Sequence, residues 1–594
     1  MRWTVICAAI AAVAMAGPAG AAETYYIGDF KGSVPRDDRH CGTGKLAHPE
    51  PHPCATLSYW TDLRREVLRE GDRVHLAQGS YSDLRPTGYH CLAAQRGVTY
   101  EGRTPEDESL ADATRKVVID LVGATKDAVC FGRGVTCPST RGCDASGFTV
   151  RDIEFRGGPN QGVKIDVPKN VTTEGLLFER VRVVNFGAQG FNISNQPSDI
   201  DCSTTGRRVR DLVIRDSIIE SNHGVFGGIA INCVDGFLLE GNVVRSNLPT
   251  GCTWNECSSG KCSCNDHDGV QLGGAINGVV RGNTIHNCGE DCLDLGGHWR
   301  KTYNVTVEDN WIYNGASRWV KISGQAHDIA LRNNFFTGRG LFEIGTCERN
   351  IDVYNNTLWR ADDGLVLKLW TKCHSCEFVN NIIRGSAGSA SERIVMVSRA
   401  NTDADTVWTN NLIYNEGDVG WAIREELGRG NCGNCTCGGQ CEAPQWCPDP
   451  WPAAQRDSRL TQGDLERFQA RGDAGDWFGP ESGDSDVWGV SPEVVDADAP
   501  TAANLHLAPT DTAARARGRD LSGAARCMVG FCVKGSPGMK CRTNSDCGIR
   551  VDYDGDRRIG SWDIGADELN KADMAIDEET PAEPGEAGAT SAAD

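Results

Sequence analysis

The chain has 594 residues, a formal net charge of −21 and an isoelectric point near 5.1. Such an acidic protein repels a phosphate backbone, which argues against nucleic acid as a partner. It also repels acidic glycans, so a polyuronate substrate would need a bound cation or a local basic patch to bridge the two negative charges.

Residues 1–21 are predicted to be a removable export signal. Arg2 gives a positive start, Val5–Ala16 is a short apolar run, and Ala19-Gly20-Ala21 fits the small-residue cleavage rule. The run is too short to span a bilayer comfortably, and no later stretch is long and apolar enough to do so. We therefore expect a secreted or periplasmic, soluble protein without a transmembrane segment.

The cysteine count supports export. Of the 27 cysteines, Cys7 lies in the signal, which leaves an even number that suggests disulfides. Zinc sites are the alternative, but Cys262-Ser263-Cys264 and Cys435-Thr436-Cys437 are too closely spaced for the usual zinc ligand pattern. The pairing of the cysteines stays open.

Residues 22–90 are predicted to form an N-terminal cap, in which Leu57–Leu68 is a helix that covers the open end of the core. After it, one short strand pattern recurs, and its last residues fall at 231, 272, 295, 322, 344 and 369. The gaps after 272 are 22 to 27 residues long. The longer gap from 231 to 272 contains four cysteines and is predicted to be a disulfide-tied insertion.

A second pattern alternates apolar residues and ends in Asn or Asp. Its members are Asp216, Asn242, Asn283, Asn310, Asn334, Asn356, Asn381 and Asn411. Asn tolerates the left-handed conformation at a sharp corner, and stacked Asn side chains can hydrogen-bond from one turn to the next. Short strands, sharp corners and a period of 22–27 predict an all-β fold, a right-handed parallel β-helix over about 91–425, with coils about 4.8 Å apart.

The remainder of the chain loses this repeat. Residues 426–500 are predicted to be an irregular, disulfide-tied connector rich in Cys, Gly and Pro, residues 501–571 a closing segment, and residues 572–594 a disordered acidic tail. Asp552, Asp554 and Asp556 resemble the start of a calcium loop without its terminal glutamate, so a structural turn is favoured and a bound cation stays open.

The centres of the first pattern are expected to point away from the core, to solvent. Down the stack they are Ala230, Gln271, Asp294, Lys321, Glu343 and Lys368, and the last four alternate in sign. One interpretation is a salt-bridge ladder, in which each exposed pair contributes roughly 0–1 kcal/mol. The other interpretation is a chemical site.

Acidic residues near this column favour the second interpretation. Asp266 and Asp268 precede one strand, and Glu290, Asp291 and Asp294 enter the next. Stacked coils would bring these carboxylates together, where they repel one another unless a cation lies among them. Oxygen ligands in this number suit Ca²⁺.

This order of acids followed by a lysine one coil later resembles the parallel β-helix pectate lyases that use a lysine base. The resemblance implies Ca²⁺ held by Asp266 or Asp268, which stay alternatives, and by Glu290, Asp291 and Asp294, with Lys321 as the catalytic base. Glu290 departs from the aspartate that those lyases favour. An acidic polysaccharide is then the expected partner, bound by Arg318, His298, Arg300 and Lys368, and we expect a monomer.

Two alternatives remain. The segments Asn265–Gly269, Gly289–Cys292, Gly297-His298 and Arg318–Lys321 also resemble the motif order of polygalacturonases. This would make Asp268, Glu290 and Asp291 the acid and base of an inverting hydrolase, although His298 follows the acid pair too soon for that family. The third hypothesis is a β-helix that binds glycan or sits at the cell surface without catalysis, because fold alone does not give function.

Overall fold

The fold is seen in a computed structural model of the chain. The residues described are 22–28, 68–82, 92–104, 117–121, 127–131, 144–167, 171–195, 202, 208–224, 227–296, 301–324, 326–345, 348–360, 362–369, 373, 375–386, 394–398, 407–415, 423–426, 487–488, 526–528 and 531–534.

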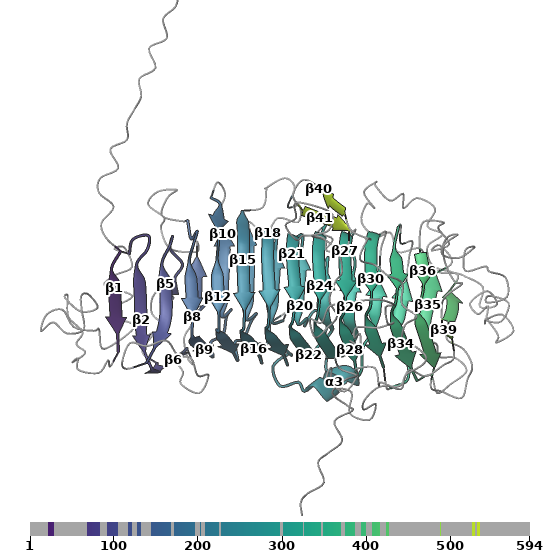
Figure 1. The fold of residues 1–594 in the computed structure, drawn as a ribbon. Helices are drawn as coiled ribbons and strands as arrows, with labels where there is room; N and C mark the ends of the chain where they lie inside the picture. Colours follow the sequence, from purple (N-terminus) through teal and green to yellow (C-terminus); the bar gives the residue numbers. More distant parts are fainter. Residues whose placement is uncertain are drawn as a thin grey trace, which may run out of the picture.

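Three long parallel sheets run side by side along the molecule (Figure 1). Sheet A contains β1 Thr24–Ile27, β2 Arg73–Ala77, β5 Thr99–Arg103, β8 Thr149–Arg151, β11 Thr173–Glu174, β12 Leu177–Glu179, β15 Val209–Arg215, β18 Val234–Glu240, β21 Ile276–Arg281, β24 Tyr303–Glu308, β27 His327–Arg332, β30 Arg349–Tyr354, β33 Glu377–Val379 and β36 Val407–Thr409.

Sheet B contains β3 Gly79–Tyr81, β6 Val117–Asp120, β9 Ile153–Arg156, β13 Arg182–Val184, β16 Ile218–Glu220, β19 Val243–Arg245, β22 Thr284–Cys288, β25 Trp311–Gly315, β28 Phe335–Thr337, β31 Thr357–Trp359, β34 Ile382–Gly385, β37 Leu412–Asn415 and β39 Val487–Trp488. Sheet C contains β4 Leu92–Ala93, β7 Val129–Phe131, β10 Val163–Val167, β14 Phe191–Asn195, β17 Ile229–Asn232, β20 Val270–Gly273, β23 Asp291–Leu295, β26 Arg318–Ile322, β29 Phe342–Ile344, β32 Leu367–Leu369, β35 Val395–Ser398 and β38 Ile423–Glu426.

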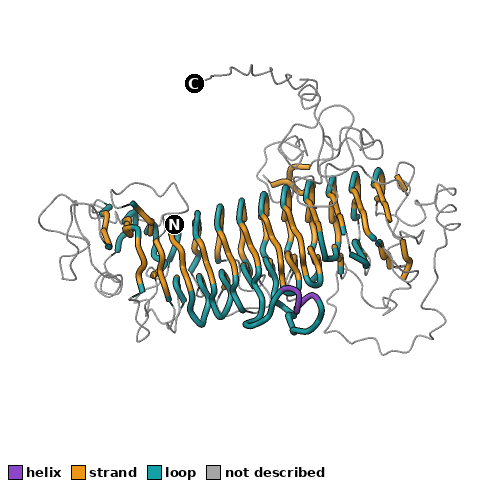
Figure 2. Tube along the Cα trace, turned by 90° about the horizontal axis from the view of Figure 1, so that it is seen from below, coloured by secondary structure: helices purple, strands orange, loops and turns teal. Residues whose placement is uncertain are grey.

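Each coil takes one strand from sheet A, one from sheet B and one from sheet C, in that order. In one coil β21, β22 and β23 follow one another, and β24, β25 and β26 form the next coil in parallel register. Figure 2 shows the coils as a regular row of rungs. The predicted right-handed parallel β-helix is therefore confirmed.

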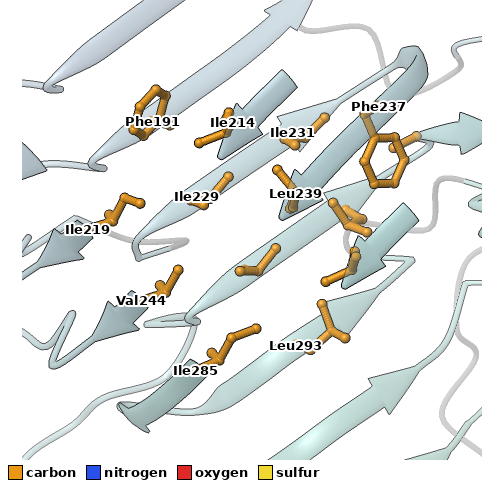
Figure 3. Packing of buried hydrophobic residues seen from close by; sticks show 14 of the residues in the cluster. Phe191, Ile214, Ile219, Ile229, Ile231, Phe237, Leu239, Val244, Ile285 and Leu293 are labelled. Atoms are coloured by element: carbon orange, nitrogen blue, oxygen red, sulfur yellow. The ribbon is translucent and has the colours of Figure 1, made fainter. Parts of the chain in front are cut away.

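Alternate side chains fill the interior between the three sheets. Ile229 and Ile231 from sheet C lie in the same buried cluster as Val244 and Ile285 from sheet B and Leu239 from sheet A, and Figure 3 shows these side chains packed together. Full burial of one such side chain contributes roughly 1.5–3 kcal/mol. Repetition over many coils makes this column of side chains the main source of stability.

The corner between sheets A and B carries the predicted asparagine ladder. Each ladder Nδ2 donates to the Oδ1 of the next coil's asparagine at 2.9–3.1 Å, through Asn242, Asn283, Asn310, Asn334, Asn356, Asn381 and Asn411. All seven side chains are buried. Because every donor and acceptor has a partner, the corner satisfies its polar groups without water.

Two details of the ladder prediction were wrong. Asp216 lies one residue before the ladder position of its coil. Ser217 occupies that position, and the backbone N–H of Ser217 donates to Asn242 Oδ1 at 3.0 Å. The left-handed backbone also belongs to the preceding residue, as at Asp216 with φ 52° and Asp309 with φ 56°. The side chain that stacks inward and the residue that turns the corner are thus neighbours.

The cysteine-rich insertion of the 231–272 gap is tied by Cys252–Cys262 and Cys257–Cys264, as predicted for this loop. It contains the short helix α3, Trp254–Ser258, whose N-terminus is capped by Thr253. Three further disulfides join described cysteines: Cys202–Cys233, Cys288–Cys292 and Cys373–Cys376. Cys262 and Cys264 are therefore disulfide-bonded, as favoured over zinc binding, whereas Cys435 and Cys437 fall outside the described residues.

The ends of the chain extend the sheets. Strands β1 and β2 of the predicted N-terminal cap pair in parallel with each other, and β39 of the predicted connector pairs with β37. Strands β40 Arg526–Met528 and β41 Phe531–Lys534 form an antiparallel pair in the predicted closing segment.

Four predictions fall outside the described residues: the export signal, the cap helix up to residue 67, the Asp552–Asp556 turn and the acidic tail. None of the described helices has the length and apolar character needed to cross a bilayer.

Candidate functional site

The polar column predicted from the sequence lies on the outward side of sheet C. The register pairs Gln271 with Asp294, Asp294 with Lys321, Lys321 with Glu343, and Glu343 with Lys368 on successive coils. Inward neighbours on the same strands are buried apolar residues, so the pattern of alternation is confirmed. These side chains are one strand spacing apart, about 4.8 Å.

The prediction that this column points to solvent was wrong for several members. Gln271 and Asp294 are 3% exposed, and Glu343 is 7% exposed. Arg318 lies beside the column and bridges its coils: its Nη1 donates to Asp291 Oδ1 at 2.8 Å, and its Nε lies 3.2 Å from Glu343 Oε2. A long side chain from one coil thus covers the carboxylates of its neighbours.

Lys321 lies among the carboxylates. Its Nζ is 3.5 Å from both Asp291 Oδ2 and Asp294 Oδ2. Burial lowers the pKa of Lys321, but the charges of Asp294 and Asp291 outweigh burial and raise this pKa above its usual value. In this arrangement the amine is a charged partner of the acids.

Three aspartates have raised pKa values. Burial is the main cause of the rise in the pKa of Asp268, which the charges of Asp291 and Asp294 increase further. Burial also raises the pKa of Asp291 to about 7, against the opposing effect of Arg318. The pKa of Asp294 is raised by burial and lowered in part by Lys321. Near neutral pH these carboxyls do not all ionise without a compensating charge.

Two turns hold the acids. The backbone N–H groups of Gly289 and Glu290 donate to the carbonyl of His267 at 2.9 and 3.1 Å. The backbone N–H of Asp291 donates to Asp268 Oδ1 at 3.2 Å, and Gln271 Nε2 donates to Asp268 Oδ2 at 3.3 Å. The turn before β20 and the turn before β23 are therefore joined on adjacent coils.

Asp266 contributes differently from the other acids. Its backbone is left-handed, with φ 60°, a conformation that Asp tolerates better than most residues. Its N–H donates to Glu290 Oε2, and its side chain is exposed. Asp266 thus lies at the edge of the acidic cluster, and it contacts Glu290 through its backbone N–H.

The donor set fits a hard cation in its chemistry. Asp291 Oδ2, Asp294 Oδ1 and Gln271 Oε1 are buried without a hydrogen-bond partner, and calcium takes oxygen ligands of these kinds. Within the described part of the chain, however, no three His, Cys, Asp or Glu side chains converge closely enough to hold a metal ion by themselves. A cation here would also need oxygen atoms from Gln271 or from a ligand.

The structure brings most of the predicted site residues together. Asp268, Glu290, Asp291, Asp294, Arg318 and Lys321 form one connected group. Lys368 lies further along, with its Nζ 3.4 Å from Glu343 Oε2. His298 and Arg300 fall outside the described residues.

Two residues that contact this group were not among the predicted site residues. Gln271 and Glu343 occupy centres of the repeat, and their place in the column was the signal that could have assigned them to the site. His267 is also buried against the site, and its Nδ1 has no hydrogen-bond partner. Nothing in the sequence distinguishes His267 from an ordinary turn residue.

The family model described as "Right handed beta helix region" matches residues 214–358, which is less than half of the chain and includes all the predicted site residues except Lys368. No curated protein matches the chain.

Several solved structures are similar over long stretches at low identity. The A-module of the mannuronan C-5 epimerase AlgE6 from Azotobacter vinelandii is 18% identical, with a TM-score of 0.36, over 60% of this chain and 88% of that one. Pectate lyase Pel9A is 12% identical, with a TM-score of 0.36, over 93% of this chain and 98% of that one. An alginate lyase from Paenibacillus sp. str. FPU-7 is 11% identical, with a TM-score of 0.30, over 63% and 96%. The sheet topology and the family-model match together identify the chain as a right-handed parallel β-helix protein.

Proposed function

We propose that the chain is a secreted, calcium-dependent polysaccharide lyase that cleaves an acidic glycan by β-elimination. The observation that carries this proposal is the position of Lys321, whose Nζ lies 3.5 Å from Asp291 Oδ2 and from Asp294 Oδ2 in a cluster of buried acids. A neutral amine beside a bound cation is what proton abstraction next to a uronate carboxylate requires.

In this proposal Asp268, Glu290, Asp291 and Asp294 hold calcium together with oxygen atoms from Gln271 or from the bound glycan, and Asp266 adds a carboxylate at the exposed edge of the group. Calcium, when bound, supplies positive charge that offsets these acids and stabilises the negative charge that develops on the uronate. Lys321 takes the proton at Nζ, for which it must first be neutral.

Arg318 keeps the acids in place. Its Nη1 lies 3.3 Å from Glu290 Oε1 and 2.8 Å from Asp291 Oδ1. Lys368 and Arg318 supply positive charge along the face on which an acidic chain would lie, and His298 and Arg300 remain proposed glycan-binding residues from the sequence. The overall charge of −21 makes such a local cationic strip necessary for binding a polyanion.

One observation favours the inverting hydrolase as a second candidate. Burial raises the pKa of Asp291 to about 7, so this carboxyl is partly protonated near neutral pH. Asp268 lies beside it, with its Oδ1 3.2 Å from the Asp291 backbone nitrogen. A carboxyl that is partly protonated near neutral pH is what a general acid requires.

The test is a panel of polyuronates incubated with the full chain, with calcium and with a chelator. The lyase predicts new ultraviolet absorbance from an unsaturated product, and the chelator abolishes it. New reducing ends without this absorbance indicate the hydrolase. Binding without cleavage indicates a glycan-binding protein and contradicts both enzyme proposals.

A further inference from the structure

The disulfide Cys288–Cys292 encloses the corner that carries two of the site acids. Strand β22 ends at Cys288, β23 begins at Asp291, and only Gly289 and Glu290 lie between the strands. Both cysteines are buried in the interior of the helix, at 1% and 0% exposure. The cross-link therefore lies on the inner side of the corner, whereas the acids lie on the outer side.

The next coil makes the same corner without a disulfide. The register pairs Cys288 with Gly315 and Asp291 with Arg318, so that corner also has two connecting residues, Ala316 and Ser317. The N–H of Ala316 donates to the carbonyl of Cys288 at 3.1 Å, which stacks the two corners directly. A corner of this length forms in this helix without a cross-link, so folding of the corner does not explain the disulfide.

The two corners differ in charge. The first carries Glu290 and Asp291 next to Asp268 and Asp294, and the charges of these acids act on one another. The second carries Ala316 and Ser317 before the cation Arg318. Arg318 and Lys321 offset part of this charge, but the carboxylates on adjacent coils still repel one another, and this force has no counterpart at the second corner.

The length of the disulfide loop indicates a local role. The two cysteines are 4 residues apart in sequence, compared with 31 for Cys202–Cys233. A short loop restricts the unfolded chain less than a long one, so its closure adds less to global stability. The effect of the Cys288–Cys292 bond is therefore concentrated on the residues it encloses.

We infer that the Cys288–Cys292 disulfide is a positioning element that holds Glu290 and Asp291 in the geometry of the site against their mutual repulsion with neighbouring acids. The consequence for calcium binding and cleavage rests on the proposed function. The effect on amide exchange at the corner does not rest on the proposed function, because the backbone hydrogen bonds of the corner exist without any ligand.

The test compares C288A/C292A with a matched control, C373A/C376A, in the full chain. The control removes another short, fully buried disulfide, with a separation of 3 residues, which follows β32, three coils beyond β23. Hydrogen–deuterium exchange mass spectrometry follows the amides of Gly289, Glu290 and Asp291, which are hydrogen-bonded to the turn of the preceding coil. Titration calorimetry with calcium chloride alone follows cation binding.

In C288A/C292A, amide exchange at residues 289–291 is expected to be at least tenfold faster than in the wild type, and calcium binding at least tenfold weaker. In the control C373A/C376A, both quantities are expected to stay at their wild-type values. Wild-type exchange rates at this corner in C288A/C292A would overturn the inference, as would equal acceleration along the whole helix. If C288A/C292A does not fold, the variant C288G/C292A replaces it. This variant has glycine at position 288, as the next coil has at Gly315, and the same exchange and calcium measurements are made on it.

Failure of the proposed function gives a different result. A wild-type chain that neither binds calcium nor cleaves any polyuronate contradicts the lyase. The exchange of the three amides still decides whether the disulfide holds the corner.

Discussion

Arg318 Nη1 lies 2.8 Å from Asp291 Oδ1 across the boundary between β26 and β23. The same guanidinium contacts Glu290 on one side and Glu343 on the other, so one cation joins the carboxylates of the two coils that flank its own. The planar, forked guanidinium suits this task better than an ammonium would. The acid cluster is held together by this contact as much as by the backbone register.

Removal of the Arg318 side chain is expected to lower the free energy of unfolding. Arg318→Ala leaves the buried Asp291 without its nearest cation, and breaking a buried pair in this way costs roughly 3–5 kcal/mol. Chemical denaturation measures the loss. Arg281→Ala is the matched control, because the Arg281–Glu240 pair lies on sheet A and is more exposed, at 43% and 30%, so that its loss costs about 0–1 kcal/mol. Equal losses in both variants would show that Arg318 is not a buried clamp.

The asparagine ladder gives a second prediction. Asn310 Nδ2 donates to the carbonyls of Val280 and Glu308 and to Asn334 Oδ1 at 2.8–3.0 Å. Asn310→Ala leaves buried acceptors without donors and destabilises the helix by about 3 kcal/mol, given about 1 kcal/mol for each lost bond. Thermal or denaturant unfolding measures this, and a loss below about 1 kcal/mol would contradict the stabilising role of the ladder.

The period of the repeat and the register of the outward column could be predicted from the sequence, because both follow from alternation along short strands. The burial of Asp294 and Glu343 could not, because it depends on the side chains of neighbouring coils, among them Lys321 beside Asp294 and Arg318 beside Glu343. The place of Asp216 was missed by one residue, since Asp is suited to the left-handed corner as well as to the ladder. The exposed position of Asp266 depends on the turn geometry before β20, which the spacing of the acids does not encode.

The charge of Asp268 is expected to lower the stability of the calcium-free chain and to strengthen calcium binding. Its raised pKa shows that its charged form is disfavoured by burial and by Asp291 and Asp294. Asp268→Asn removes this charge and is expected to raise the free energy of unfolding of the chelator-treated chain at pH 8, because ionisation of a carboxyl whose pKa is raised in the folded state opposes folding. The same variant is expected to weaken calcium binding. Denaturation and calorimetry measure the two effects, and a destabilised variant with unchanged calcium affinity would contradict this account.

His286 predicts a pH dependence of stability away from the site. Burial, assisted by the charge of Arg245, lowers the pKa of His286 to about 4, while its ring stacks on Tyr313 at 4.4 Å. An unfolded histidine has a pKa of about 6.5, so between these values the unfolded chain binds more protons and stability falls as the pH falls.

His286→Phe keeps an aromatic ring against Tyr313 and removes the titrating group. The free energy of unfolding of this variant is expected to decrease less than that of the wild type between pH 6.5 and 4. Identical slopes in the two proteins would mean that His286 is not held neutral in the folded state.

The most direct measurement of the central claim is the rate of ultraviolet absorbance increase on a polyuronate in calcium for wild type, Lys321→Ala and Lys164→Ala. Lys164 occupies the same outward column on β10 and pairs with Asp166 at 3.6 Å, several coils from the acids. The account predicts that Lys321→Ala abolishes the increase with nearly unchanged calcium affinity, while Lys164→Ala retains it. Full activity in Lys321→Ala would contradict the assignment of Lys321 as the base.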